Sequence, residues 1–442
     1  IVTSILMFFL AGKIFYYSYN KSSFLFPLFT ALIFVCHPID TEVVTYIYNR
    51  SASLSALFYL LSLLLFIKSA EGKRNLYVLS ILSFILSFLS KEMAITLPVM
   101  ILTFDYIFLS DFKISKVIEK KYFHIPFWIV FTILLLLQFC YFKSIEKTNI
   151  ENFWPGYSYY LTQPWIIMKY LRLLLIPAGL CIDHRFNPII MITEYRAVIS
   201  CIFILCIFII VWKLYKNRNN RSKAILFGII WFFITLSPTN VFVVHIGERH
   251  LYLAGIGFYI IVSALFLSFD EAYFNNNRKF ITSLIIPIII LGILTIKRNK
   301  IYQNPLLIWQ DVILQYPNNP RAYNNRGYIY YTQGDLLRAI SDYNKALQIN
   351  PNFAIVYHDR GLAYQDQGNI FQAISDYNKA LQINPNYDAA YLNRGFAYQN
   401  QGKIPQALSD YNKALQINPN FEEAYYNRGL VYQTRGNLPQ AL

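Results

Sequence analysis

Charged residues are scarce in this chain, and acidic ones are the scarcest. Asp, Glu, Lys and Arg together make up 14% of 442 residues, with 24 acidic side chains against 39 Lys and Arg. So little charge is unusual for a soluble protein of this length. Cysteine is scarce as well: the five cysteines are odd in number, scattered and without metal-ligand spacing. This argues against a disulfide framework or a zinc site, and we expect buried structural thiols.

Apolar residues take the place of the missing charge. They make up 56% of the chain, and the mean hydropathy is +0.36. Up to about residue 300 they form long stretches separated by short polar islands, whereas residues from 304 onward are polar and repeat every 34 positions. We therefore expect an all-α protein with two domains, a polytopic transmembrane helix bundle over 1–300 and an α-solenoid of helical repeats over 304–442.

The apolar stretches are long enough for about ten membrane-spanning helices. The expected spans are roughly 1–18, 23–36, 51–69, 75–90, 93–109, 123–142, 194–215, 222–237, 251–269 and 280–296. The stretch 158–178 is interrupted by polar residues, and Lys169 and Arg172 lie three apart on one helical face, so we expect it to lie flat in the interface. The chain begins inside an apolar stretch and stops partway through a repeat, so we expect the protein to extend beyond both ends.

Basic loops set the expected orientation. Clusters of Lys and Arg follow the helices ending near residues 69, 109 and 215, and cytoplasmic loops favour such residues. This placement explains the formal net charge of +15 without nucleic-acid binding. The protein is then an integral, multi-pass membrane protein whose repeats lie on the extracytoplasmic side, periplasmic or lumenal.

Polar islands of mixed charge fall on that same outer side. Charges at helix ends within a membrane are costly unless they are paired or used, so these islands supply the candidate site residues. They are His37, Asp40, Glu42, Arg50, Lys91, Glu92, Glu248 and Arg249. Helix capping is the alternative explanation for any one island. Convergence of several islands on one face favours a functional site.

Four motifs in a fixed order carry a family resemblance. They are HPIDTEVV at 37–44 followed by Asn49 and Arg50, SKEMAITLP at 90–98 followed by Asp105, YLRLLLIPAGL at 170–180, and ERHLYL at 248–253 followed by Gly257 and Phe258. In this order they resemble the transmembrane-and-TPR protein O-mannosyltransferases, a branch of the GT-C membrane glycosyltransferases. The resemblance implies transfer of a sugar, typically mannose, from a polyprenyl-phosphate carrier to Ser or Thr hydroxyls of proteins.

Such a transfer implies roles for the candidate residues. Arg50 and Arg249 suit the departing phosphate because a guanidinium matches its oxygens, with Lys91 as a point charge. His37, Glu92 and Glu248 complete the lipid-phosphate or substrate site. Glu42, Glu92 and Glu248 orient these cations, or alternatively Glu42 or Asp40 acts on the acceptor hydroxyl. In the family the main acidic pair lies in a loop upstream of the helix matching 1–18, so we expect the principal base before residue 1. The donor is polyprenyl-phosphate-linked sugar; no cofactor is certain, and the sequence fixes no metal requirement.

The 34-residue period recurs in every part of the polar half. Aromatic, glycine and alanine positions repeat in register, as at Tyr323, Gly327 and Ala339. These repeats resemble tetratricopeptide repeats, pairs of antiparallel helices that stack into a concave surface. We expect a half repeat, three full repeats and one truncated repeat. The residues that vary at the expected binding face are Asn324, His358, Leu392 and Tyr426.

Two other functions remain open at this stage. One is an O-antigen ligase or polymerase-like membrane enzyme, which also pairs many helices with such repeats. The other is a non-catalytic membrane scaffold that recruits partners through the repeats. The ordered motifs favour the glycosyltransferase, which would contact membrane lipid, the polyprenyl-phosphate sugar and an acceptor or partner protein.

Overall fold

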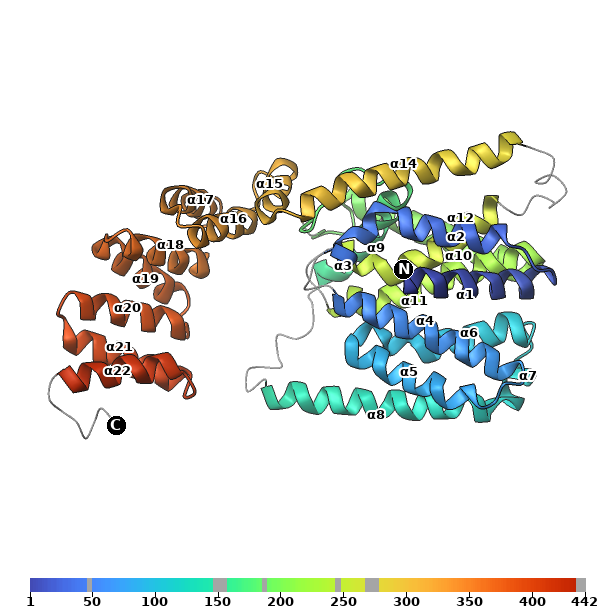
Figure 1. Ribbon diagram of the computed structural model, residues 1–442, viewed down its shortest axis with the longest axis horizontal. Helices are drawn as coiled ribbons and strands as arrows, with labels where there is room; N and C mark the ends of the chain where they lie inside the picture. The colour runs from blue at the N-terminus through green and yellow to red at the C-terminus, as the bar shows by residue number, and fades with distance from the viewer. Residues whose placement is uncertain (46–49, 146–156, 185–188, 243–247, 267–277, 435–442) are drawn as a thin grey trace. The chain divides into compact units, whose positions relative to one another are not determined.

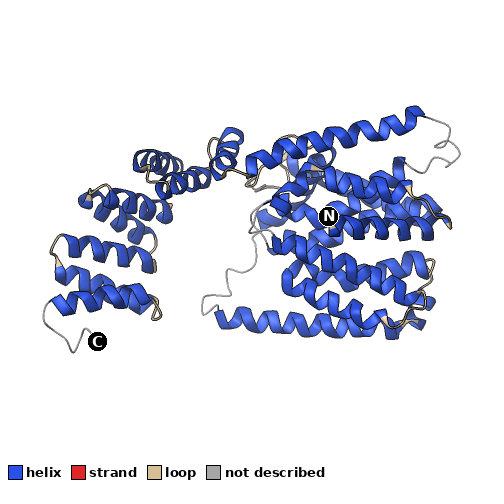
Figure 2. Ribbon diagram, viewed as in Figure 1, coloured by secondary structure: helices blue, strands red, loops and turns tan. Residues whose placement is uncertain are grey.

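A computed structural model describes the chain except for residues 46–49, 146–156, 185–188, 243–247, 267–277 and 435–442. The described residues form helices and connecting turns with no strand (Figure 1, Figure 2). They divide into two compact units, Ile1–Gln303 and Asn304–Leu442. The expected all-α fold is therefore confirmed.

The first unit is a bundle of helices of very different lengths. Its first half contains α1 (Val2–Tyr19), α2 (Leu25–Cys36), η1 (Pro38–Asp40), α3 (Thr41–Thr45), α4 (Arg50–Ala70), α5 (Leu76–Ser90), η3 (Glu92–Thr96), α6 (Leu97–Phe104), η4 (Asp105–Leu109) and α7 (Ile114–Glu119). Its second half contains α8 (Lys121–Ile145), α9 (Tyr157–Leu175), α10 (Tyr195–Asn217), α11 (Asn220–Phe242), η6 (Glu248–His250), α12 (Leu251–Phe266) and α14 (Arg278–Tyr302).

Within the described residues, seven helices are long and apolar enough to cross a membrane, or eight if one bent pair counts as a span. The sequence predicted ten, and the differences have local causes. The stretch 23–36 continues past Pro38 after a 52° bend. The stretch 75–90 forms α5, whose 15 residues reach only about 22 Å, short of a hydrocarbon core of about 30 Å. Residues 280–296 lie within α14, which is not among the seven, and α9, expected to lie flat, is also not among them.

The helices of the bundle pack closely through small residues. On α4 and α5, the hydroxyl of Ser62 donates to the Ser80 carbonyl at 2.7 Å, and the hydroxyl of Ser80 donates back to the Ser62 carbonyl at 2.6 Å. Between α11 and α12, a Cβ added to Gly228 would lie 2.6 Å from the Gly257 carbonyl oxygen. Small residues at such crossings let backbones approach within a membrane.

The second unit consists of paired helices that follow the 34-residue period. They are α15 (Pro305–Gln315), α16 (Pro320–Thr332), α17 (Leu336–Ile349), α18 (Ala354–Asp366), α19 (Ile370–Ile383), α20 (Asp388–Asn400), α21 (Ile404–Ile417) and α22 (Glu422–Thr434). Repeated glycines explain the close packing within each pair: a Cβ on Gly327 would lie 2.9 Å from the Tyr343 ring. The continuation of the last repeat, 435–442, lies outside the described residues.

An arginine at a fixed place in each repeat is explained by an ion pair across the helix pair. Arg326, Arg360 and Arg394 each donate from Nε and Nη2 to both oxygens of the aspartate 16 residues later, at 2.7–2.8 Å. The three aspartates, Asp342, Asp376 and Asp410, are buried. Two parallel bonds from one guanidinium are the strong form of this interaction. These arginines therefore hold helix to helix.

Candidate functional site

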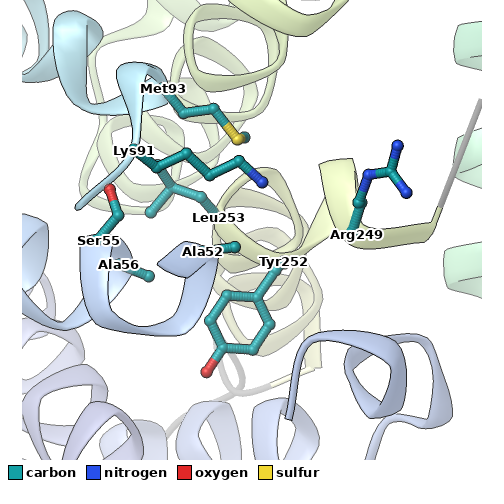
Figure 3. A pocket seen from close by; sticks show the side chains of 8 residues that line it. All are labelled: Ala52, Ser55, Ala56, Lys91, Met93, Arg249, Tyr252 and Leu253. Atoms are coloured by element: carbon teal, nitrogen blue, oxygen red, sulfur yellow. The ribbon is translucent and has the colours of Figure 1, made fainter. Parts of the chain in front are cut away.

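Two of the polar islands meet at a small recess between α4, η3 and α12. Its lining residues are Ala52, Ser55, Ala56, Lys91, Met93, Arg249, Tyr252 and Leu253 (Figure 3). The enclosed volume is about 10 Å³, room for about one water. Figure 3 shows the Lys91 amine directed among the lining residues, whereas the Arg249 guanidinium extends away from them. An anion that contacts both cations would lie across the mouth of the recess.

Arg249 is held by a carboxylate from the first island. The backbone N–H of Arg249 donates to Glu42 Oε2 at 2.9 Å, and Arg249 Nη1 lies 3.7 Å from Glu42 Oε1. The Glu42 side chain is fully buried, while the Arg249 side chain is 32% exposed. A buried carboxylate thus fixes both the backbone and the guanidinium, and it leaves the other face of the guanidinium open to a ligand.

Lys91 lies within electrostatic range of the same groups. It ends α5 in an extended conformation and begins the turn of η3. Burial lowers the pKa of its ammonium and Arg249 lowers it further, whereas Glu92 and Glu42 raise it. Two cations held this close repel each other. Binding an anion between them would relieve that repulsion.

Glu248 organises a second buried group beside this recess. The backbone N–H of Cys181 donates to Glu248 Oε1, His184 Nε2 lies 3.4 Å from the same oxygen, and Arg298 Nη2 lies 3.7 Å from Oε2. Arg298 also stacks over the Tyr302 ring at 5.2 Å. Glu248 therefore joins η6 to the 181–184 loop and to α14.

Sequence reasoning missed most of this second group. The candidate residues drawn from the sequence included neither His184 nor Arg298. Arg298 lies in a run with Lys297 and Lys300 that resembles a basic helix end. Burial, together with the positive charge of nearby Lys169, lowers the pKa of His184 to about 3. His184 is therefore a neutral imidazole at physiological pH.

Other predicted residues of the membrane half lie apart from the recess lining. Arg50 is the exposed first residue of α4, and Glu92 is exposed at the start of η3. The two ring nitrogens of His37 contact the Leu174 carbonyl and the Ile39 N–H, at 3.0 and 3.2 Å. Asp40 is buried and accepts from the Tyr259 hydroxyl at 3.1 Å. His37 and Asp40 thus have contacts that stabilise the bundle.

The four predicted partner-binding residues of the repeats differ in exposure. Asn324, His358 and Leu392 are buried, whereas Tyr426 is 68% exposed. His358 contacts Asp359 through Nδ1 at 3.0 Å and Asn393 of the next repeat through Nε2 at 2.9 Å. These contacts make His358 part of the packing between repeats. Only Tyr426 of the four presents a large surface to a partner.

The arrangement as a whole can hold an anion next to a carboxylate. Lys91 and Arg249 supply positive charge. Glu42 holds Arg249, and Glu248 holds Arg298. Within the part of the chain that the structure describes, no group of three or more His, Cys, Asp or Glu side chains is placed to hold a metal ion. The cationic side chains that line the recess are Lys91 and Arg249.

Comparison with known proteins finds similarity for both the membrane unit and the repeats. A family model described as TPR repeat matches residues 327–368, 366–402 and 400–436. A protein O-mannosyl-transferase of Caenorhabditis elegans is 26% identical over 338 residues, which cover 73% of this chain and 46% of that protein. The protein O-mannosyl-transferase TMTC3 of Mus musculus is 21% identical over 361 residues, 74% of this chain and 39% of that protein.

Among solved structures, MamA is 27% identical and covers 33% of this chain and 86% of its own, with a TM-score of 0.30. The family resemblance drawn from the sequence is confirmed by the curated relatives and the TPR match. The chain has the apolar helices of a multi-pass membrane protein, as expected. It spans about half the length of the curated relatives it matches.

Proposed function

We propose that the protein containing this chain is a membrane protein O-mannosyltransferase, and that the recess at Lys91 and Arg249 binds the phosphate of a polyprenyl-phosphate mannose donor. The single observation that carries the proposal is the arrangement of Lys91, Arg249 and buried Glu42, in which two cationic residues border one recess and one of them is fixed by a carboxylate. Similarity to the mannosyltransferases supports the sugar and the protein acceptor.

The geometry supports a defined division of labour. As the bond between sugar and phosphate breaks, negative charge builds on the departing phosphate, and positioned cations stabilise that charge. The partly exposed guanidinium of Arg249 offers paired donors to phosphate oxygens, and the Lys91 amine adds a point charge. Glu42 acts by holding Arg249, and the acceptor hydroxyl is deprotonated by a base elsewhere in the protein.

The repeats would present the acceptor polypeptide on the extracytoplasmic side, where the recess also opens. A stacked array of repeats forms an extended surface suited to a polypeptide chain, and it supports protein binding here. The exposed Tyr426 is the predicted contact that remains available for this role.

The test is mannose transfer by the full-length protein in membranes, from radiolabelled mannosyl-phosphoryl polyprenol to a Ser/Thr-containing peptide. Arg249→Ala should lower transfer by about a hundredfold, the scale seen when one positioned stabiliser of transition-state charge is lost. Arg249→Lys should recover part of the rate, because the charge stays and the planar fork is lost. Lys68→Ala, a basic residue at the other end of α4, is the matched control. Transfer at the parental rate by Arg249→Ala would refute the assignment.

A further inference from the structure

An apolar groove lies in the membrane unit far from the recess, near the end of α10 that carries the basic loop. It is lined by Tyr106, Ile107, Phe208, Val211, Trp212, Tyr215, Leu226 and Ile230, from η4, α10 and α11, and its volume is about 220 Å³. That is far more room than the recess at Lys91 offers, enough for a stretch of hydrocarbon chain. The side chains at its outer edge are lipid-facing, with Phe208 and Trp212 68% and 69% exposed.

The groove has the depth of one leaflet. Its residues on α10 run from Phe208 to Tyr215, and the helix ends at Asn217. The ten residues from Phe208 to Asn217 span a rise of about 14 Å, close to half of a hydrocarbon core of about 30 Å. The groove therefore matches an acyl chain that enters from the membrane surface at the basic end of α10. A lipid tail that starts at the opposite surface would have to cross the other leaflet first.

The rim of the groove is aromatic and positively charged. The hydroxyls of Tyr106 and Tyr215 are hydrogen bonded at 3.1 Å, and the Arg218 guanidinium lies over the Tyr215 ring at 4.7 Å and the Phe112 ring at 5.0 Å. Residues 213–223 contain five Lys and Arg and no acid. Lys223 is paired with Asp111 at 2.8 Å, whereas Lys213, Lys216 and Arg218 have no carboxylate partner among the described residues.

We propose that this groove binds an anionic glycerophospholipid, with an acyl chain between α10 and α11 and the phosphate at Arg218 and Lys216. The apolar groove accommodates the acyl chain, and the cations at its rim attract the negatively charged headgroup. Each Lys or Arg near a membrane surface favours anionic lipid about fivefold. This site is separate from the donor site and does not depend on the proposed function.

Trp212 provides a reporter within the groove itself. The whole chain is reconstituted in phosphatidylcholine nanodiscs that contain a brominated lipid. The brominated lipid is phosphatidylglycerol in one sample and phosphatidylcholine in the other, at equal mole fraction. Bromine quenches tryptophan on contact, and subtraction of the Trp212→Phe protein isolates the signal of Trp212. Brominated phosphatidylglycerol should quench Trp212 at least threefold more than brominated phosphatidylcholine.

Variants then separate the charged rim from the apolar groove. Lys216→Gln and Arg218→Gln should each lower the preference for phosphatidylglycerol about fivefold. Lys216 is exposed, so its replacement leaves folding intact even if Arg218→Gln does not. Val211→Phe should fill the groove and reduce quenching by both lipids, while Arg74→Gln, a basic residue in the turn between α4 and α5, is the control. Three outcomes would overturn the proposal. They are equal quenching by the two lipids, an unchanged lipid preference in Lys216→Gln, and displacement of the brominated lipid by polyprenyl phosphate but not by phosphatidylglycerol.

Discussion

Glu42 and Arg249, 207 residues apart in the chain, meet through both oxygens of one carboxylate. Oε2 accepts the Arg249 backbone N–H at 2.9 Å, and Oε1 lies 3.7 Å from Nη1 of the same residue. The first contact fixes where η6 begins, and the second fixes the direction of the guanidinium. A single buried side chain therefore determines both the position and the charge environment of the recess.

Replacing Glu42 should separate these two roles. Glu42→Gln keeps an oxygen for the Arg249 N–H but removes the charge, so we expect nearly parental stability and a loss of transfer. Glu42→Ala leaves a buried backbone donor without its acceptor, which costs about 1–3 kcal/mol of stability. Thermal unfolding in detergent, followed by the transfer assay, measures both effects.

The Glu42→Gln variant shows whether the negative charge of Glu42 serves mannose transfer or the stability of the fold. If Glu42→Gln unfolds as readily as Glu42→Ala, the negative charge itself stabilises the fold. If it transfers mannose at the parental rate, the charge on Glu42 does not help to position Arg249. Glu92→Gln, which changes an exposed carboxylate beside Lys91, is the matched control for both readings.

Local features of the structure could be predicted from the sequence, whereas contacts between distant segments could not. The repeats were predicted down to individual positions because each repeat packs mainly on its neighbours, so Tyr343 and Gly327 had counterparts throughout. The islands at Glu42, Lys91 and Arg249 were found because charge in an apolar chain is conspicuous. Their pairing was not predicted, since nothing in the sequence shows which helix ends meet.

Two further features lay beyond sequence reasoning for the same reason. Arg298 meets Glu248 only because the fold brings these side chains of α14 and η6 together, and its basic neighbours in the sequence made it look like part of a helix end. The recurrent arginine of the repeats is explained only by the structure, in which Asp376 and its counterparts lie opposite it, 16 residues later. A position that looks exposed in one helix was in fact half of a bidentate pair with the next.

The Arg360–Asp376 pair predicts a strong effect of removing one partner. Asp376 is 5% exposed, so Arg360→Leu, the residue usual at this place in such repeats, would leave a buried carboxylate uncompensated. We expect a loss of about 3–5 kcal/mol, as for other broken buried pairs. Chemical denaturation of residues 304–442 measures it. The double variant Arg360→Leu/Asp376→Leu should recover most of the loss, and failure to recover would mean that the arginine acts through packing alone.

The same variant should show a pH dependence of definite sign. Burial raises the pKa of Asp376 above its usual value, while Arg360 lowers it, so removing Arg360 should raise it further. A folded-state pKa above the unfolded one means that the penalty is full at pH values above the folded pKa and disappears below the unfolded value of about 3.9. The stability difference between Arg360→Leu and the parent should therefore shrink as the pH falls toward 4. A difference that is constant with pH would exclude Asp376 as its source.

The orientation predicted from the basic loops can be tested directly. Protease added to sealed, right-side-out vesicles should remove the repeats after Asn304 and leave the loop at 213–223 intact, since its Lys and Arg residues predict a cytoplasmic position. Antibodies against the two segments read the result. Protection of the repeats, with cleavage in the loop, would reverse the orientation and place the recess on the cytoplasmic side.

Lys169 should titrate far below an ordinary lysine. It lies in α9 near Glu248, and burial lowers the pKa of its ammonium to about 8, with Arg172 lowering it and Glu248 raising it. Because the folded-state pKa is below the unfolded value of about 10.4, the cost of charging Lys169 is full below pH 8 and fades as the pH rises toward 10.4. Competitive labelling with acetic anhydride, read by mass spectrometry, should give a midpoint near pH 8 for Lys169. A lysine-containing model peptide in the same sample gives the unperturbed midpoint of about 10.4. Equal midpoints would show that Lys169 is solvated, and that α9 does not close over Glu248 as the structure has it.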